Sequence, residues 1–203
     1  MTSRSSAAPA GPHGGREAIA EAVLEVLVNG GADALTVRKI ATAAGVSVGA
    51  VQHHFPTRAS LITAAMHTVT MHFRTRLRAA LTGAATAEER VRVFCDELAA
   101  LGDEGRRDAV VWAAFASRAA TDPEVRLLHQ REWARTEEGL RTLLTEAYPR
   151  ADISADDAAL VLAALDGIAV ARGAEGDARM TAERGRRLVR AVLAPLAARG
   201  GKL

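Results

Sequence analysis

The sequence predicts an all-α protein of about nine helices. From Arg16 onward, apolar residues recur at helical spacing, and no stretch alternates for long with the period of two that marks a β-strand. Aromatic residues make up only 3% of the chain, and β-branched clusters are few, which also disfavours a sheet. No segment repeats at a period of roughly 20–50 residues, so a solenoid is not expected.

The first predicted helix covers residues 16–28. It places Ile19, Val23 and Leu27 on one apolar stripe, and the run Asn29-Gly30-Gly31 ends it.

Two short helices follow. The first begins after Thr36, a suitable N-cap, buries Ile40 and ends at Gly45. The second runs from Val48 to His54 after Ser47 as N-cap, and Pro56 closes it.

Six longer helices complete the prediction. Asp122 as N-cap with Pro123 at the first helical position marks the start of one of them. The six predicted ranges are 58–81, 87–101, 106–119, 123–148, 154–172 and 181–196.

Composition excludes several classes of protein. With 49% hydrophobic and 25% charged residues, the chain has the balance of a soluble globular protein, and no apolar run approaches the ~20 residues of a membrane span. The single cysteine, Cys95, excludes a disulfide framework. A net charge of +2 means that any nucleic-acid surface is a local patch. Residues 1–15 are predicted to be a disordered tail without a secretory h-region, so we expect a cytoplasmic protein.

Residues 36–55 have the sequence form of a helix-turn-helix. The small Ala41 and Ala44 allow two helices to cross closely, Gly45 can adopt the positive φ of a tight turn, and Val46 fills the core below it. On the second helix the polar positions point away from the apolar Val51. Such a narrow outer face fits the major groove of DNA.

Residues 40–62, IATAAGVSVGAVQHHFPTRASLI, resemble the DNA-binding motif of the TetR family of bacterial transcriptional regulators. Two positions depart from the family pattern: Arg58 stands in place of the usual lysine, and Gln52 stands where an aromatic residue is commoner. The matching residues are Ala41, Ala44, Gly45, Val46, Ser47, Gly49, Val51, His54, Phe55 and Leu61.

The resemblance implies a role for each residue of the motif. Phosphate contacts are implied for Thr36, Ser47, His54, Thr57 and Arg58. Base contacts are implied for Val48, Gly49, Ala50, Gln52 and His53. Arg38 and Lys39 either contact phosphates or form a solvated face, and Arg4 either reaches a minor groove or has no role.

The resemblance also implies a helix-turn-helix domain over residues 16–60 and an effector-binding and dimerisation domain over residues 61–203. Independently, the last two predicted helices are apolar over more of their surface than one packing stripe requires, which favours a homodimer over a monomer with a buried central helix. The predicted interface residues are Leu160, Val161, Leu165, Ile168, Leu188, Val192 and Leu196. A twofold dimer predicts a pseudo-palindromic operator in double-stranded DNA, with half-sites roughly 34–36 Å apart.

Large apolar side chains between the predicted fourth and eighth helices are candidates for a small-molecule pocket, although such side chains on a helix are more often core than pocket. They are Met66, Phe73, Phe94, Leu98, Trp112, Phe115, Trp133 and Leu140. The residues around Trp133 form a conspicuous polar face. His129 with Glu132 lacks the further ligands of a metal site, and Cys95 lies on an apolar stripe that favours an inert thiol.

These features favour a ligand-responsive transcriptional regulator, most simply a repressor, that needs no cofactor or metal. Its predicted fourth helix would couple the DNA-binding and ligand-binding parts. The chain shows no nucleophile–base arrangement, paired metal carboxylates or phosphate loop, so we do not expect an enzyme. The alternatives are an activator or a regulator that responds to no ligand, and a helical carrier or enzyme whose helix-turn-helix is incidental.

Overall fold

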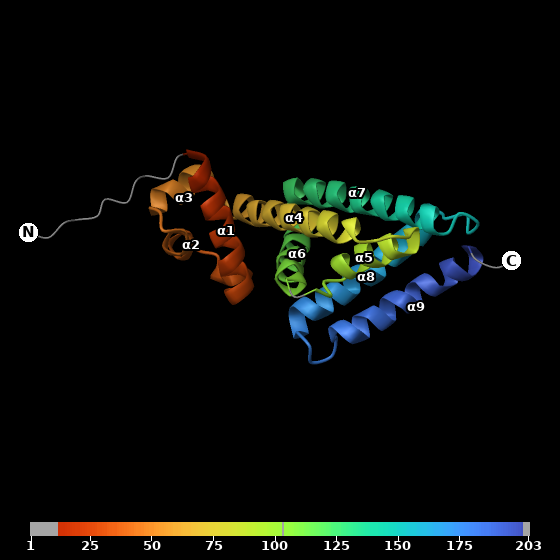
Figure 1. The fold of residues 1–203 in the computed structure, drawn as a ribbon. Coiled ribbons are helices and arrows are strands. Elements are labelled where there is room, and N and C mark those ends of the chain that lie inside the picture. The colour runs from red at the N-terminus through yellow and green to blue at the C-terminus, as the bar shows by residue number, and fades with distance from the viewer. Residues whose placement is uncertain (1–11, 103, 201–203) are drawn as a thin grey trace, which may run out of the picture. The chain divides into compact units, whose positions relative to one another are not determined.

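The computed structural model describes residues 12–102 and 104–200, and for residues 12–14 it describes the backbone alone. Over these residues the chain forms nine α-helices, a single 3-10 turn and no strand, which confirms the all-α prediction (Figure 1). None of the described helices is both long and apolar enough to cross a membrane. The elements are α1 (Pro12–Gly30), η1 (Ala32–Ala34), α2 (Val37–Ala44), α3 (Val48–His54), α4 (Arg58–Thr82), α5 (Ala87–Leu98), α6 (Gly105–Ala119), α7 (Pro123–Ala147), α8 (Ala155–Glu175) and α9 (Ala182–Gly200).

Several helix ends differ from the prediction. Helix α1 begins at Pro12 rather than Arg16, since proline suits a first helical position; the rest of the predicted tail, residues 1–11 with Arg4, lies outside the described residues. Helix α5 ends at Leu98 instead of continuing to Leu101, because Ala100 adopts a left-handed φ of 57°. Helix α9 continues to Gly200, past the predicted end.

The chain divides into two compact units, Met1–Thr68 and Val69–Leu203. The division lies inside α4 rather than after residue 60, where the sequence suggested a boundary. Helix α4 is therefore continuous from one unit into the other.

The core of the first unit is built from the predicted stripe of α1. Ile19, Val23 and Leu27 are fully buried, as are Ile40 of α2 and Val51 of α3. Helix α1 contacts both α2 and α3, so the three helices share this core.

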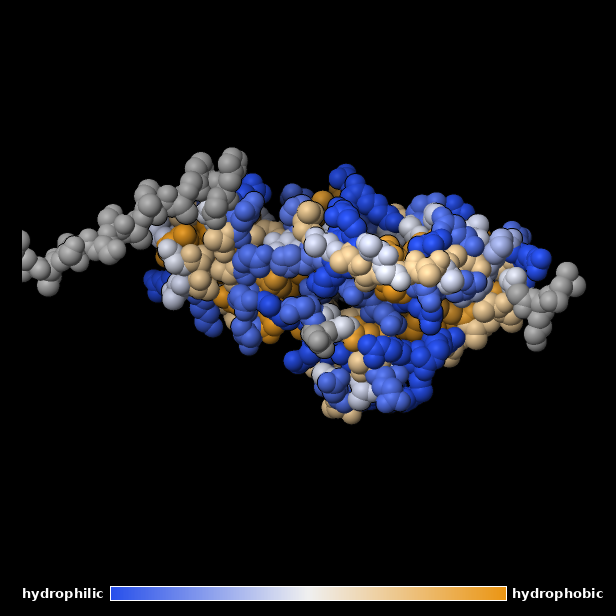
Figure 2. Space-filling view, viewed as in Figure 1, coloured by the Kyte–Doolittle hydropathy of each residue, from blue (hydrophilic) through white to orange (hydrophobic). Residues whose placement is uncertain are grey.

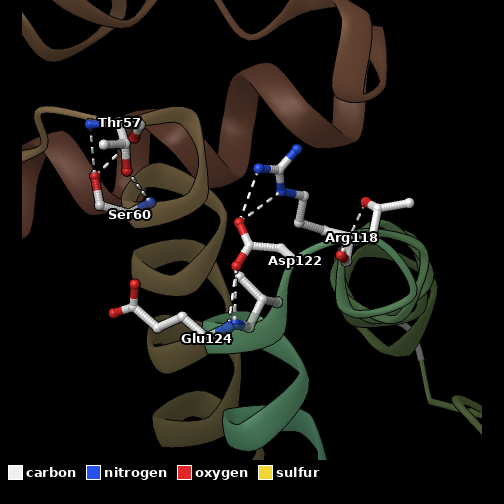
Figure 3. Close-up of polar contacts among 7 residues, drawn as sticks. Thr57, Ser60, Arg118, Asp122 and Glu124 are labelled. Carbon is white, nitrogen blue, oxygen red and sulfur yellow. Dashed lines mark hydrogen bonds and ion pairs between the residues drawn. The ribbon is translucent and has the colours of Figure 1, made fainter.

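Polar caps define where α4 and α7 begin (Figure 3). At the start of α4, Ser60 Oγ accepts a hydrogen bond from the Thr57 backbone N–H at 3.1 Å, and Thr57 Oγ1 accepts one from the Ser60 N–H at 3.0 Å. At the start of α7, Asp122 Oδ1 accepts the backbone N–H of Glu124 at 3.1 Å, which confirms Asp122 as the predicted N-cap.

The larger core of the second unit is formed by α5, α7, α8 and α9. Val91, Leu140, Leu144 and Leu165 are almost fully buried in it. Cys95 is also fully buried, and burial raises the pKa of its thiol to about 12. Because the thiolate is the reactive form, Cys95 is inert, as the sequence predicted.

Arg172 is the one charged residue buried in the described part of the chain, at 7% exposure. Its guanidinium donates to the carbonyl oxygen of Ala100 at 2.7 Å and to that of Met180 at 2.9 Å, and it lies 3.1 Å from Asp177 Oδ1. The side chain thus satisfies two carbonyls at bends of the backbone, one of them at the left-handed Ala100. A buried carbonyl without a donor costs about 1–3 kcal/mol.

We expect Arg172→Met to lower the free energy of unfolding by about 2–4 kcal/mol, because both carbonyls lose their donor while the side-chain volume is largely kept. Urea denaturation followed by circular dichroism measures this. The matched control is Arg179→Met, since Arg179 is exposed and pairs with Glu175 at 2.7 Å on the surface. Equal urea midpoints for the two variants would show that the buried contacts of Arg172 contribute nothing.

Candidate nucleic-acid interface and aromatic pocket

The turn between α2 and α3 has the predicted geometry. Thr36 Oγ1 accepts the Lys39 backbone N–H at 3.3 Å at the start of α2, and Ser47 Oγ accepts the Ala50 N–H at 3.1 Å at the start of α3. Gly45 ends α2 with φ 64° and ψ 31°, in the left-handed region that favours glycine. The Val46 N–H then donates to the Ala41 carbonyl at 3.0 Å and closes the turn. These local bonds hold α3 at a defined angle to α2.

Helix α3 presents its polar side outward. Val51 and Phe55 are buried beneath it, at 0% and 3% exposure. Exposed residues make up its outer side, which we call the recognition face. The recognition face consists of Val48, Gly49, Gln52 and His53. The remaining predicted base contact, Ala50, is half-buried, so its side chain is less available than those of the recognition face.

Three of the predicted phosphate contacts act as helix caps. The hydroxyls of Thr36, Ser47 and Thr57 each accept a backbone N–H in the first turn of α2, α3 and α4 respectively. All three residues are exposed. Helix N-termini offer unpaired backbone N–H groups that bind phosphate. His54 is half-buried, with its ring 6.4 Å from that of Phe55.

Arg58 lies in a different environment from the one the motif suggested. Its guanidinium donates to the backbone carbonyl of Ala32 and lies 3.6 Å from the Asp33 carboxylate. Arg58 therefore ties the start of α4 to η1, and only part of its donor set remains for a phosphate.

The structure adds a cation that the motif did not contain. The Arg16 guanidinium of α1 lies 5.4 Å above the ring of Phe55, at the end of α3. Arg16 precedes the motif in the sequence by many residues, so no local signal could assign it. Arg38 and Lys39 of α2 are exposed, and neither forms an ion pair within the described residues. The first unit therefore carries three cations close to the helix-turn-helix in fold or sequence: Arg16 at the end of α3, and Arg38 and Lys39 on α2.

A cluster of aromatic rings lies in the second unit. The His129 ring of α7 stacks on Trp112 of α6, with centroids 4.8 Å apart and an interplanar angle of 21°. Trp133, one turn further along α7, lies 5.9 Å from His129. The indole Nε1 of Trp112 donates to the carboxylate of Asp166 on α8. Three helices thus contribute to one aromatic cluster with a carboxylate beside it.

A pocket of about 620 Å³ adjoins this cluster, and we call it the aromatic pocket. Its wall combines two aromatic rings with three carboxylates and no basic side chain other than the imidazole. The lining residues are Ala116, His129, Gln130, Trp133, Ala134, Glu137, Glu138 and Asp166.

Three ionisable groups of the aromatic pocket have pKa values that differ from their ordinary values. Burial raises the pKa of Asp166, opposed by the hydrogen bond from Trp112 and the charge of His129. Burial lowers the pKa of His129, opposed by the Asp166 carboxylate. The hydrogen bond from Arg141 lowers the pKa of Glu138, which keeps that carboxylate ionised. At neutral pH the histidine is uncharged, so the pocket carries net negative charge.

The sequence had suggested a different set of pocket residues. Of its eight candidates only Trp133 lines the aromatic pocket. Trp112 does not line the pocket, but its ring stacks against that of Trp133. Phe94, Phe115 and Leu140 are core side chains with 7%, 1% and 0% exposure, and they do not line the aromatic pocket. The other three candidates also do not line this pocket. Phe73 packs its ring against Phe94, and Leu98 packs against the core of the second unit. Met66 lies in the part of α4 that belongs to the first unit. Among the described residues, no His, Cys, Asp and Glu side chains gather in groups of three or more that could hold a metal ion.

The predicted interface residues divide into two groups. Val161, Leu165, Ile168 and Leu196 are at most 5% exposed because they pack into the core of their own chain, which leaves them almost no surface for a partner. Leu160 and Leu188 are 68% and 36% exposed, whereas Val192 is half-buried against the core.

The exposed apolar positions form a stripe on each of the last two helices. The stripe on α8 contains Leu160, Ala163, Gly167 and Val170, and the stripe on α9 contains Leu188, Ala191 and Pro195. A Cβ atom built at Gly167 would meet nothing within 4 Å, so the space next to this face of α8 is open within the subunit.

A capped helix-turn-helix with an outward recognition face, joined to a helical unit with a pocket, defines a DNA-binding transcriptional regulator. Residues 19–65 match the family model described as "Bacterial regulatory proteins, tetR family", and residues 87–198 match "BetI-type transcriptional repressor, C-terminal". The chain belongs to the TetR family, with a C-terminal domain of the BetI type. This family consists of transcriptional regulators rather than enzymes, in agreement with the sequence.

Relatives of known name and structure agree with this assignment. The chain is 32% identical over 113 residues to the regulator BetI of Rhizobium meliloti and 32% identical over 104 residues to PksA of Bacillus subtilis. These alignments cover 56% and 51% of both chains, so the chain spans about half the length of the curated relatives it matches.

Solved structures match over nearly the whole chain. A transcriptional regulator from Rhodococcus sp. Rha1 is 30% identical with a TM-score of 0.78, over 90% of this chain and 96% of that one. A protein from Saccharomonospora viridis, solved in complex with choline, shares the fold at 20% identity and a TM-score of 0.75, over 88% and 95% of the two chains.

Proposed function

We propose that the protein is a repressor that binds a pseudo-palindromic operator as a homodimer and leaves it when a small organic cation occupies the aromatic pocket. The observation that carries the DNA-binding part is the exposed recognition face on a helix whose opposite side is buried. An α-helix presented in this way fits the major groove, where each base pair shows a distinct pattern of donors and acceptors. Arg16, Arg38 and Lys39 add the positive charge that phosphates attract.

Selection of duplexes from random-sequence DNA by the purified protein tests this proposal. We expect enrichment of an inverted repeat whose half-sites are separated by roughly 34–36 Å, or a multiple of that distance. Operator affinity should then fall steeply as salt is raised, since each neutralised phosphate releases counterions. Failure of the selection to enrich any sequence would contradict the proposal.

Gln52 tests whether the recognition face reads bases. Its amide can form two hydrogen bonds with adenine N6 and N7, so we expect Gln52→Ala to lose about 1–3 kcal/mol of base preference at one position of each half-site. Competition among operators substituted at single positions measures this loss. Lys39→Ala is the comparison, because loss of a phosphate contact weakens all sequences alike. A uniform loss for Gln52→Ala would make it a phosphate contact instead.

The homodimer is supported by the apolar stripes on α8 and α9. On α8, Leu160 at 68% exposure lies in line with the exposed Ala163, Gly167 and Val170, and a contiguous exposed apolar stripe of this kind is typical of an interface. A twofold partner would bury the stripes in a four-helix arrangement and place two recognition faces on one duplex.

The effector class follows from the lining of the aromatic pocket. The electron-rich face of an indole attracts cations, and carboxylates complete the charge balance, so Trp133, Asp166 and Glu137 together suit a quaternary ammonium group. The choline complex of the Saccharomonospora viridis protein supports this class of effector. We infer a small organic cation of the choline type.

Ion pairs on α4 offer a route by which the effector could act on DNA binding. Arg74 of α4 lies 3.8 Å from Glu132 of α7, the residue next to Trp133. Arg76 of α4 bonds Glu97 of α5 at 3.2 Å and also Asp108 of α6. An effector that shifts α7 would therefore shift α4, and α4 continues into the unit that carries the recognition face.

Effector binding should weaken in acid. As pH falls through the lowered pKa of His129, the ring becomes a cation inside a site built for a cation; Asp166, whose pKa is raised, then loses its negative charge as well. Both changes oppose a bound ammonium, so we expect choline affinity to fall as the pH is lowered below the ordinary histidine pKa of about 6.5. Calorimetric titration measures it, and His129→Gln should remove much of the difference. An affinity for choline that does not depend on pH would contradict the assigned site.

A further inference from the structure

A second pocket, of about 500 Å³, lies elsewhere in the second unit and shares no lining residue with the aromatic pocket. The end of α4 and the turn after it form one wall, α5 forms another and α9 a third. The lining residues are Ala80, Gly83, Ala84, Glu89, Arg92, Val93, Asp96, Arg186, Val189 and Arg190. We call it the arginine pocket. Strongly hydrophilic side chains gather over α9 in Figure 2.

The arginine pocket carries three guanidinium groups against two carboxylates, and one of these carboxylates is engaged with the backbone. Glu89 Oε2 accepts the N–H of Ala85 at 2.7 Å and that of Thr86 at 3.2 Å as part of the cap of α5. These two hydrogen bonds lower the pKa of Glu89 and keep its charge at the helix start.

The other carboxylate, Asp96, forms an ion pair with Arg186. Its carboxylate lies 3.5 Å from Arg186 Nε, and the charges of Arg92 and Arg190 also act on it. Arg190 forms no ion pair within 4 Å in the described part of the chain. Glu89 Oε1 also lies 3.7 Å from Arg92 Nη2, so both carboxylates face guanidinium groups. Three exposed guanidinium groups against two carboxylates leave the pocket a surplus of about one positive charge, and two carboxylates do not engage all the N–H donors of three guanidinium groups.

We propose that the arginine pocket binds a small organic acid, a carboxylate with a short aliphatic chain. Guanidinium groups form paired hydrogen bonds with a carboxylate, and the surplus of one charge matches a monoanion. Ala80, Ala84, Val93 and Val189 supply an apolar wall for the chain of the ligand. The chemistry is opposite to that of the aromatic pocket, so the two sites select different ligands.

The arginine pocket stays open in the proposed dimer. Successive residues of a helix are separated by about 100°, so Arg186 and Arg190 project within about 40° of each other, while Leu188 and Ala191 project roughly 140–200° away from Arg186. The apolar stripe of α9 therefore covers a different face. Since one wall belongs to α4, occupancy of this pocket would bear on the same helix that the cation effector acts on.

Calorimetric titration of the full chain with hexanoate tests the site. We expect saturable binding with a Kd of a few mM or tighter, weakened at least about tenfold in Arg186→Ala/Arg190→Ala. The matched control is Arg187→Ala, which removes a neighbouring arginine that pairs with Glu183 at 2.6 Å and does not line the pocket. Hexylammonium, which has the same chain and the opposite charge, should not compete with hexanoate.

Two results would overturn the proposal: no heat of hexanoate binding in the wild type up to about ten times the expected Kd, or equal binding by the wild type and Arg186→Ala/Arg190→Ala. Circular dichroism and the urea midpoint of the double variant establish that it is folded, independently of any ligand. Choline titration of the same variants keeps the result separate from the proposed function, since choline binding should be the same in the wild type and the double variant whatever the outcome with hexanoate. A second variant, Arg186→Lys/Arg190→Lys, keeps the charge and should bind hexanoate more weakly than the wild type but more tightly than the alanine pair.

Discussion

Leu160→Glu should convert the dimer into a monomer and reduce operator affinity by roughly 10²–10⁴-fold, the gain that joining two binding modules provides. Leu160 is 68% exposed on α8, in the apolar stripe that we assign to the twofold interface. A glutamate there would bring two like charges close to the axis in an apolar contact. Light scattering gives the mass of the particle, and anisotropy of a labelled operator gives the affinity.

Leu127→Glu is the matched control for this variant. Leu127 is an exposed leucine, at 55%, but it lies on α7 and belongs to neither stripe. The same charge at this position should leave both the mass and the operator affinity unchanged. If Leu160→Glu remained dimeric, or if a monomeric Leu160→Glu bound the operator as tightly as the wild type, the assigned interface would be wrong.

Asp166→Asn combined with Trp133→Leu should weaken choline binding by about 100-fold, because the site loses its half-buried negative charge and its π face together. The asparagine oxygen can still accept the hydrogen bond from Trp112 Nε1, so the support of the aromatic cluster is kept. Calorimetry measures the affinity. The chain holds only two tryptophans, and both belong to this cluster, so quenching of intrinsic fluorescence by choline reports the same event in the wild type.

Glu138→Gln is the control for the pocket variant. Glu138 also lines the pocket, but its carboxylate is exposed and already pairs with Arg141 at 2.8 Å. Its removal should change choline affinity only slightly, since an exposed paired charge contributes little. If Glu138→Gln weakened choline binding as much as the double variant, the exposed Glu138 would hold the cation, and Trp133 and Asp166 would not.

The helix-turn-helix could be predicted because its determinants are local. Thr36, Ser47 and Gly45 act on backbone groups within four residues of themselves, and such signals are visible in the sequence. The contacts of Arg58, in contrast, could not be predicted from local signals in the sequence. Its partners Ala32 and Asp33 lie some 26 residues away, and only the folded chain brings them together.

The pocket could not be predicted, because helical periodicity identifies an apolar face without saying what covers it. Phe115 and Trp133 follow the same pattern, yet one is core and the other lines the pocket. One signal was available: Asp166 is a lone carboxylate between the apolar Leu165 and Ile168. Its partner Trp112 is 54 residues distant, so the pair emerges only from the packing of α6 against α8.

The stripes of α8 and α9 show the same limit. The sequence predicted both helices to be unusually apolar, and Leu160 and Leu188 are the exposed leucines of these helices. It could not separate these from Val161 and Leu165, because a helix that packs against its own chain on one side and carries exposed apolar residues on the other looks uniformly apolar in sequence.

The most direct measurement is a choline titration of the protein bound to its selected operator, with DNA anisotropy and tryptophan fluorescence followed in the same sample. Linkage between the two sites predicts that operator affinity falls about 5–150-fold, with its midpoint at the choline concentration that half-saturates the fluorescence change. Fluorescence that saturates while the DNA stays bound with unaltered affinity would show that the pocket and the recognition face are uncoupled.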